Sequence, residues 1–116
     1  MERMGFVIRV KPEKMDDYRR VHANVWPEVL DRIAACNIRN YSIFLYPPEH
    51  LMFSYYEYHG TDYDADMAFM AAHEKTQAWW NLCKPMMEPL TTRAAGEFWA
   101  GMEQIFHMDK QAGPRT

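Results

Sequence analysis

The alternation of apolar and polar side chains predicts four strands. Residues 5–11 alternate with a period of two and end at a proline, which is typical of a half-buried strand. Two β-branched and aromatic segments, 38–46 and 51–58, are separated by a short turn that contains two prolines. We expect these two segments to form an antiparallel hairpin, and residues 102–108 to form the last strand.

Two longer segments have helical character. The first should begin with the Pro-Glu pair after the first strand and run from 12 to about 35, with a kink or break just before Pro27, since proline removes a helical hydrogen bond. The second should run from about 63 to 83, with Thr61 or Asp62 as its N-cap, and later prolines prevent its continuation.

The order β-α-β-β-α-β is that of an α+β, ferredoxin-like domain with a four-stranded antiparallel sheet and both helices on one face. We expect one domain over residues 1–109 and a flexible tail over 110–116. The second face of the sheet would carry residues such as Phe44, Phe53 or Tyr56, which are too apolar to leave in water. A partner sheet should cover that face, most simply in a symmetric homodimer.

Composition excludes several classes of protein. The 116 residues suffice for one core, and no apolar run approaches the ~20 residues needed to span a bilayer, so we expect no membrane insertion. A net charge of −3 argues against a general nucleic-acid binder. Cys36 and Cys83 form no CxxC pair and are expected to be reduced and structural, in a cytoplasmic protein.

One predicted helix carries a candidate active face. Tyr18, His22 and Trp26 are spaced i, i+4, i+8, which keeps a phenol, an imidazole and an indole on one side. Imidazole is suited to proton transfer near neutral pH, and flanking aromatic rings suit a small, partly apolar ligand. The alternative is a histidine at the rim of a core helix whose aromatic rings only pack.

The Trp79–Trp80 doublet near the end of the second helix is the other unusual feature. Adjacent helical positions differ by ~100°, so one indole can pack against the sheet while the other closes a pocket. With both helices on one sheet face, this end and the His22 segment could bound one cleft that has Tyr41 as its floor. A purely structural role for both indoles is the alternative. For Glu57 in its strand we expect a rim position facing solvent, with a functional carboxylate as the alternative.

Motifs for other chemistries are missing from the sequence. The five histidines form no HxH, HExxH or Cys-His set, so we expect no metal. There is no glycine-rich phosphate loop and no GxSxG elbow, so nucleotide and acyl chemistry are not expected.

Several separated motifs resemble the L-rhamnose mutarotase family. These are DYRRVHANVWPEV, then NYSIFL, then the Trp79–Trp80 doublet, then EQIFHMD, and the resemblance covers residues 4–109. It implies a dimeric α+β barrel enzyme that interconverts the α and β anomers of L-rhamnose, or of a related 6-deoxy sugar, without a cofactor. Proton transfers alone achieve this reaction, which is consistent with the missing cofactor motifs.

The resemblance also implies the site residues. His22 corresponds to the family's proton donor, and Tyr18, Tyr41, Trp79 and Trp80 correspond to its sugar contacts. The segment 85–96 does not align with the family pattern, which leaves the choice of sugar open if that segment covers the pocket.

Two rival functions remain open from the sequence. Cofactor-free monooxygenases and haem-degrading enzymes are also small ferredoxin-like dimers with Trp and His in the cleft, although haem or a quinone needs a larger apolar cavity. A non-catalytic small-molecule-binding module would tolerate loss of His22.

Overall fold

The computed structural model describes residues 1–109 and 112–115. Of the tail predicted over 110–116, residues 110, 111 and 116 therefore lie outside the described residues. In the part that is described, no helix has both the length and the apolar character needed to cross a membrane.

The antiparallel sheet is organised around β1 (Glu2–Val10). One edge of β1 pairs with β3 (Leu51–Tyr58), which in turn pairs with β2 (Ile38–Tyr46). The other edge pairs with two short strands, β4 (Met87–Glu88) and β5 (Ala100–Met102). The bounds of β2 and β3 and their antiparallel pairing are those that the sequence predicts.

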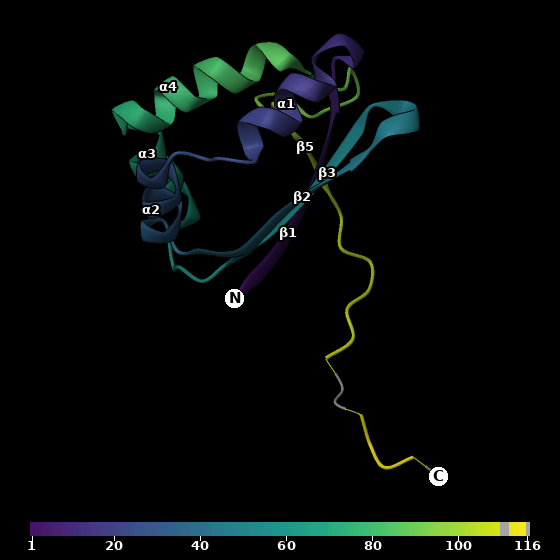
Figure 1. The fold of residues 1–116 in the computed structure, drawn as a ribbon. Helices are drawn as coiled ribbons and strands as arrows, with labels where there is room; N and C mark the ends of the chain where they lie inside the picture. The colour runs from purple at the N-terminus through teal and green to yellow at the C-terminus, as the bar shows by residue number, and fades with distance from the viewer. Residues whose placement is uncertain (110–111, 116) are drawn as a thin grey trace.

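The prediction for the last strand was wrong. Strand β5 ends at Met102, where the predicted strand 102–108 should begin, and residues 103–109 have no strand pairing. This segment leaves the body of the molecule as an extended chain (Figure 1). Strands of two or three residues are too short to show a period in the sequence, so β4 and β5 gave no signal.

The first predicted helical segment is broken, as expected. A 3-10 turn (Pro12–Lys14) leads into α1 (Met15–His22), and α2 (Pro27–Ala35) follows. Pro27 is the first residue of α2, and Trp26 before it is extended, with φ −60° and ψ 131°. A residue before proline is sterically biased away from the helical region, which explains why the helix stops and restarts here.

The second predicted helix is also two helices, which the sequence did not indicate. It consists of α3 (Tyr63–Ala71) and α4 (Glu74–Cys83), with His73 extended between them. Side chains satisfy groups at the break: Gln77 Nε2 donates to the carbonyl oxygen of the last α3 residue at 2.7 Å, and His73 Nδ1 lies 2.9 Å from Thr76 Oγ1. The break contains neither proline nor glycine, so the local sequence did not indicate it.

The helices lie on one side of the curled sheet (Figure 1). Between these two layers lies the core, where Ile8, Met52 and Val29 are almost fully buried. The α+β fold class is thereby confirmed. Cys36 and Cys83 are both buried and free, as the sequence predicts.

The outer face of the sheet carries exposed aromatic side chains. Phe44 is 65% exposed and pairs with Phe53, which is 37% exposed. The prediction that Tyr56 shares this face was wrong, since Tyr56 is buried and lines the space under the helices. Side chains of a strand alternate between its faces, so positions 53 and 56 of one regular strand point to opposite sides.

Candidate active site

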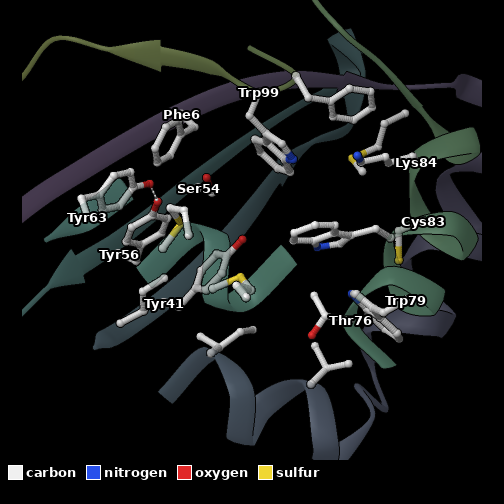
Figure 2. Close-up of a pocket in the computed structure, with 18 residues that line it drawn as sticks. Phe6, Tyr41, Ser54, Tyr56, Tyr63, Thr76, Trp79, Cys83, Lys84 and Trp99 are labelled. Carbon is white, nitrogen blue, oxygen red and sulfur yellow. Dashed lines mark hydrogen bonds between the residues drawn. The ribbon is translucent and has the colours of Figure 1, made fainter. Parts of the chain in front are cut away.

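A cavity of about 330 Å³ lies between the helices and the inner face of the sheet (Figure 2). This volume is at the small end of the roughly 300–1,000 Å³ range of ligand pockets. Its walls are rich in aromatic rings from every layer of the fold, namely Phe6, Tyr41, Tyr56, Tyr63, Trp79, Trp80, Phe98 and Trp99. Such a cavity suits one small molecule that has both polar and apolar surfaces.

Hydroxyl groups also line the cavity, between the aromatic rings. Ser54 and Thr76 line the cavity and are almost fully buried. The Tyr56 and Tyr63 hydroxyls hydrogen-bond to one another, and burial together with this bond raises the pKa of Tyr56. These four hydroxyl groups can donate and accept hydrogen bonds, and none of the four residues was predicted as a site residue.

Three of the five predicted site residues meet at the cavity. Tyr41, Trp79 and Trp80 all line it, and Figure 2 shows the Tyr41 hydroxyl pointing inward. The Tyr41 residue is 42% exposed, but its hydroxyl end is buried, which raises its pKa to about 12. Tyr41 is therefore a neutral donor and acceptor at the position predicted for the cleft floor.

The other two predicted residues, Tyr18 and His22, are not among those that line the cavity. They form an aromatic stack at the end of α1, with ring centroids 3.9 Å apart and an angle of 17° between the rings. The His22 ring meets Trp79 edge-on at 5.2 Å, and Trp26 meets Trp79 at the same distance. Trp79 thus stands between His22 and the cavity.

The protonation state of His22 follows from its surroundings. Nδ1 lies 3.0 Å from the backbone carbonyl oxygen of Tyr18, and a carbonyl only accepts, so Nδ1 carries the hydrogen and Nε2 keeps a lone pair. Burial lowers the pKa of His22 below its ordinary value, although the bond to Tyr18 opposes this shift. At neutral pH the ring is an uncharged base, and Nε2 has no hydrogen-bond partner among the described residues.

Two residues that line the cavity, Tyr41 and Cys83, influence the pKa of the Tyr18 hydroxyl. Burial is the main cause of its raised pKa, and nearby Tyr41 and Cys83 raise the pKa further. Burial also raises the pKa of Cys83 to about 11, so this thiol is uncharged as well. The region between α1 and the cavity therefore holds neutral donors and acceptors.

The segment 89–99, which overlaps the region 85–96 that did not align with the family pattern, closes one side of the cavity. It carries Phe98 and Trp99, which pack against the core and line the cavity. The Lys84 ammonium lies 5.3 Å from the ring centroids of both Trp80 and Phe98, so one cation joins α4 to this segment. Phe98 and Trp99 thus anchor this segment to the body of the protein.

A signal for some of the missed residues was present in the sequence. Ser54 and Tyr56 share the period-two face of β3 with buried Met52, so the alternation places them under the helices. For Thr76 no comparable signal existed, because the break between α3 and α4 was not predicted.

Fold and site together define a class: a small α+β, ferredoxin-like protein that encloses one aromatic, hydroxyl-bearing cavity. Solved structures with the same fold include the following two. An L-rhamnose mutarotase from Formosa agariphila superposes with a TM-score of 0.74 at 20% identity, covering 94% of this chain and 100% of that one. The tetracenomycin F2 cyclase from Streptomyces glaucescens gives 0.70 at 13% identity, covering 96% and 100%.

Sequence comparison narrows this class to one family. The family model for L-rhamnose mutarotase matches residues 3–108. The L-rhamnose mutarotase of Oceanobacillus iheyensis is 32% identical over 109 residues, which is 94% of this chain and 100% of that protein. That of Mannheimia succiniciproducens is 31% identical over 111 residues, with the same coverage. The chain belongs to the L-rhamnose mutarotase family.

Both adjacent indoles line the cavity, but they should differ in how much they stabilise the fold. Trp79 is 7% exposed and packs against the rings of His22 and Trp26, whereas Trp80 is only partly buried. We predict that W79A lowers the free energy of unfolding by about 3–5 kcal/mol and that W80A lowers it distinctly less. Urea unfolding of both variants at one temperature measures the two losses in free energy of unfolding, and equal losses would contradict the prediction.

Proposed function

We propose that this protein is an isomerase that interconverts the α and β anomers of L-rhamnose, or of a related 6-deoxy sugar. The observation that carries the proposal is the neutral His22, with Nε2 free, in contact with a wall of the aromatic cavity of a chain that matches the family over residues 3–108. Aromatic faces suit the C–H surfaces and methyl group of such a sugar, and the neutral hydroxyls suit its hydroxyl groups.

Mutarotation needs only proton transfers. The anomeric hydroxyl loses a proton while the ring oxygen gains one, the ring opens to the aldehyde, and closure on the other carbonyl face reverses both transfers. In our proposal His22 Nε2 takes the proton of the anomeric hydroxyl, and the resulting imidazolium donates it to the ring oxygen as the C–O bond breaks, which is the proton-donor role that the family resemblance implies. A positioned group of this kind contributes on the order of 10²–10⁴ in rate.

The phenols complete the proposed site. Tyr18 and Tyr41 have raised pKa values, so they stay protonated and can donate hydrogen bonds to the ring oxygen and to sugar hydroxyls. Trp79 and Trp80 supply the wall against which the sugar packs. Because His22 has to come within ~2.6–3.2 Å of the proton it accepts, we infer that the Trp79 indole shifts when the sugar binds.

The cavity volume weighs against the rival functions that need a large substrate. About 330 Å³ suits a monosaccharide better than haem or a quinone. Adding haemin to the purified protein and recording the Soret region distinguishes these cases, since a bound haem would shift that band. A binding module without turnover would leave the rate of anomer exchange unchanged.

We further propose a homodimer and a cytoplasmic location. The outer sheet face exposes Phe44 and Phe53, and the extended segment 103–109 exposes Ile105 (89%) and Phe106 (78%). A second copy would cover both, with the two sheets face to face and each segment lying on the other chain. Two free, buried cysteines are consistent with a reducing compartment.

The central prediction concerns His22. H22A should lower the kcat for L-rhamnose anomer exchange by on the order of 10²-fold or more, because it removes the proton acceptor. Saturation-transfer NMR measures the exchange rate, with the spontaneous rate subtracted. H22Q, which keeps a donor for the Tyr18 carbonyl but does not titrate, should be equally slow, and imidazole should partly restore H22A. If H22A instead raised KM and left kcat unchanged, His22 would act only by holding Trp79 in place.

The pH dependence should report the neutral form of His22. Protonation removes the Nε2 lone pair, and burial lowers the pKa, so kcat/KM should be flat near neutrality and fall on acidification with a midpoint below about 6.5. The measurement is anomer exchange between about pH 4.5 and 8, corrected for the spontaneous reaction. A rate that increases as pH falls through this range would show that the imidazolium is the active form.

The dimer proposal predicts a mass of two chains by size-exclusion chromatography with light scattering. F44K together with F53K should give a single-chain mass, because two cations on the outer face repel their counterparts in the second copy. L30K is the matched control, because Leu30 is also exposed and apolar but lies on α2 and not on the outer sheet face. This variant should keep the dimer mass. A single-chain mass for the unaltered protein would refute the dimer.

A further inference from the structure

Strand β2 contains one irregularity, and it lies at the cavity. Asn40 and Tyr41 both lie opposite Tyr56 of β3, so β2 has an extra residue at this point. Ile38 before the irregularity and Ile43 after it both turn toward the helices, although an odd number of positions separates them. Without the extra residue, the alternation that starts at Ile38 would send Asn40 inward and Tyr41 to the outer face.

The conformation of Asn40 makes this bulge possible. Its φ of 51° lies in the left-handed region, which asparagine tolerates better than most residues. On the outer face its Nδ2 donates to Glu57 Oε1 at 2.9 Å. This bond crosses from β2 to β3 and ties the strained residue to the neighbouring strand.

Glu57 is itself held in place by two further groups. Tyr55 Oη donates to Oε2 at 2.9 Å, and His59 Nε2 lies 3.2 Å from Oε1. These bonds, with that from Asn40 as the largest contribution, hold the pKa of Glu57 below its usual range. The carboxylate is therefore a fixed, ionised acceptor that lies outside the cavity.

Packing alone holds Tyr41 weakly. The residue is 42% exposed, and its ring touches Tyr56 with centroids 5.2 Å apart. The hydroxyl end is buried, but the rest of the side chain is exposed, so its direction depends on the backbone that carries it. The bulge at Asn40 supplies that direction.

We propose that Glu57 and Asn40 are positioning residues, which fix the bulge of β2 and thereby turn the Tyr41 hydroxyl into the cavity. The proposal rests on the proposed function in one respect, namely that Tyr41 contacts the sugar. Its structural part, that the Glu57–Asn40 bond sets the orientation of Tyr41, is independent of the substrate.

The functional test is a double-mutant cycle between N40A and Y41F. N40A should lower kcat/KM for anomer exchange by on the order of 10–100-fold, because a small misplacement of a positioned group is costly. In the Y41F background, N40A should have little further effect, since Asn40 acts through the Tyr41 hydroxyl. Independent, additive losses would overturn the proposal.

Asn37 provides a matched control. It also has a positive φ, 65°, and its Nδ2 donates to a carboxylate, Asp66 Oδ2, at 3.0 Å. N37A should lower the melting temperature about as much as N40A does while leaving kcat/KM near that of the unaltered protein. Equal losses of activity in N37A and N40A would mean that both act through general stability, and would overturn the proposal.

Two milder variants keep the test usable if N40A does not fold. N40G tolerates positive φ but lacks the amide, and E57Q keeps an acceptor for Asn40 without the charge. We expect N40G to lose activity and E57Q to retain most of it. An N40G variant with full activity would overturn the proposal.

A crystal structure of N40G or N40A separates this proposal from the proposed function. We expect the Tyr41 hydroxyl to leave the cavity, and a hydroxyl that stays in place would overturn the proposal whatever the activity. If the unaltered protein fails to accelerate anomer exchange, the proposed function fails, while the crystal structure still decides the role of Asn40.

Discussion

The pairing of β1 on both of its edges is the constraint on which the rest of the structure depends. One edge is taken by β3 along nearly its whole length, and the other is shared by β4 and β5. Since the edge strand is divided, the residues between its two parts, 89–99, cannot continue in the sheet. They fold back over the inner face and bring Phe98 and Trp99 to the cavity.

The cavity therefore lies where the sheet departs from regularity. The divided edge strand is on one side of it, and the bulge that turns Tyr41 inward is on the other. Elsewhere β1 and β3 pair without interruption and supply core residues such as Ile8 and Met52. Regular pairing builds the core, and the two irregularities shape the site, which agrees with the general enrichment of bulges next to active sites.

How far the sequence could predict this fold depended on the length and regularity of each signal. The hairpin of β2 and β3 was predicted with its bounds, because eight or more residues of strand composition flank a proline turn. The helix break at Pro27 was predicted because proline has a steric reason to cause one. The break at His73 was not predicted, because side-chain hydrogen bonds rather than a local sequence pattern stabilise it. The short strands β4 and β5 were not predicted either, because they depend on pairing with β1.

The candidate site shows the same limit. Tyr41, Trp79 and Trp80 were expected at one cleft and do line one cavity, but the reason for the inward direction of Tyr41 is a bulge that no period in the sequence reveals. The position of His22 behind Trp79 depends on how α1 and α4 pack, which the i, i+4 spacing does not determine.

The electrostatics of the region fit a reaction in which no net charge is created. Burial lowers the pKa of His22 and raises those of Tyr18 and Tyr41, so each shift favours the uncharged form. Of the described residues that line the cavity, Lys84 alone is charged, and its ammonium lies against two aromatic rings. A neutral sugar that opens and closes by proton exchange begins and ends uncharged, and either anomer can be the starting point. Neutral groups that accept and return a proton serve both directions equally, whereas a fixed ion beside the ring oxygen would favour one protonation state of the open chain over the other.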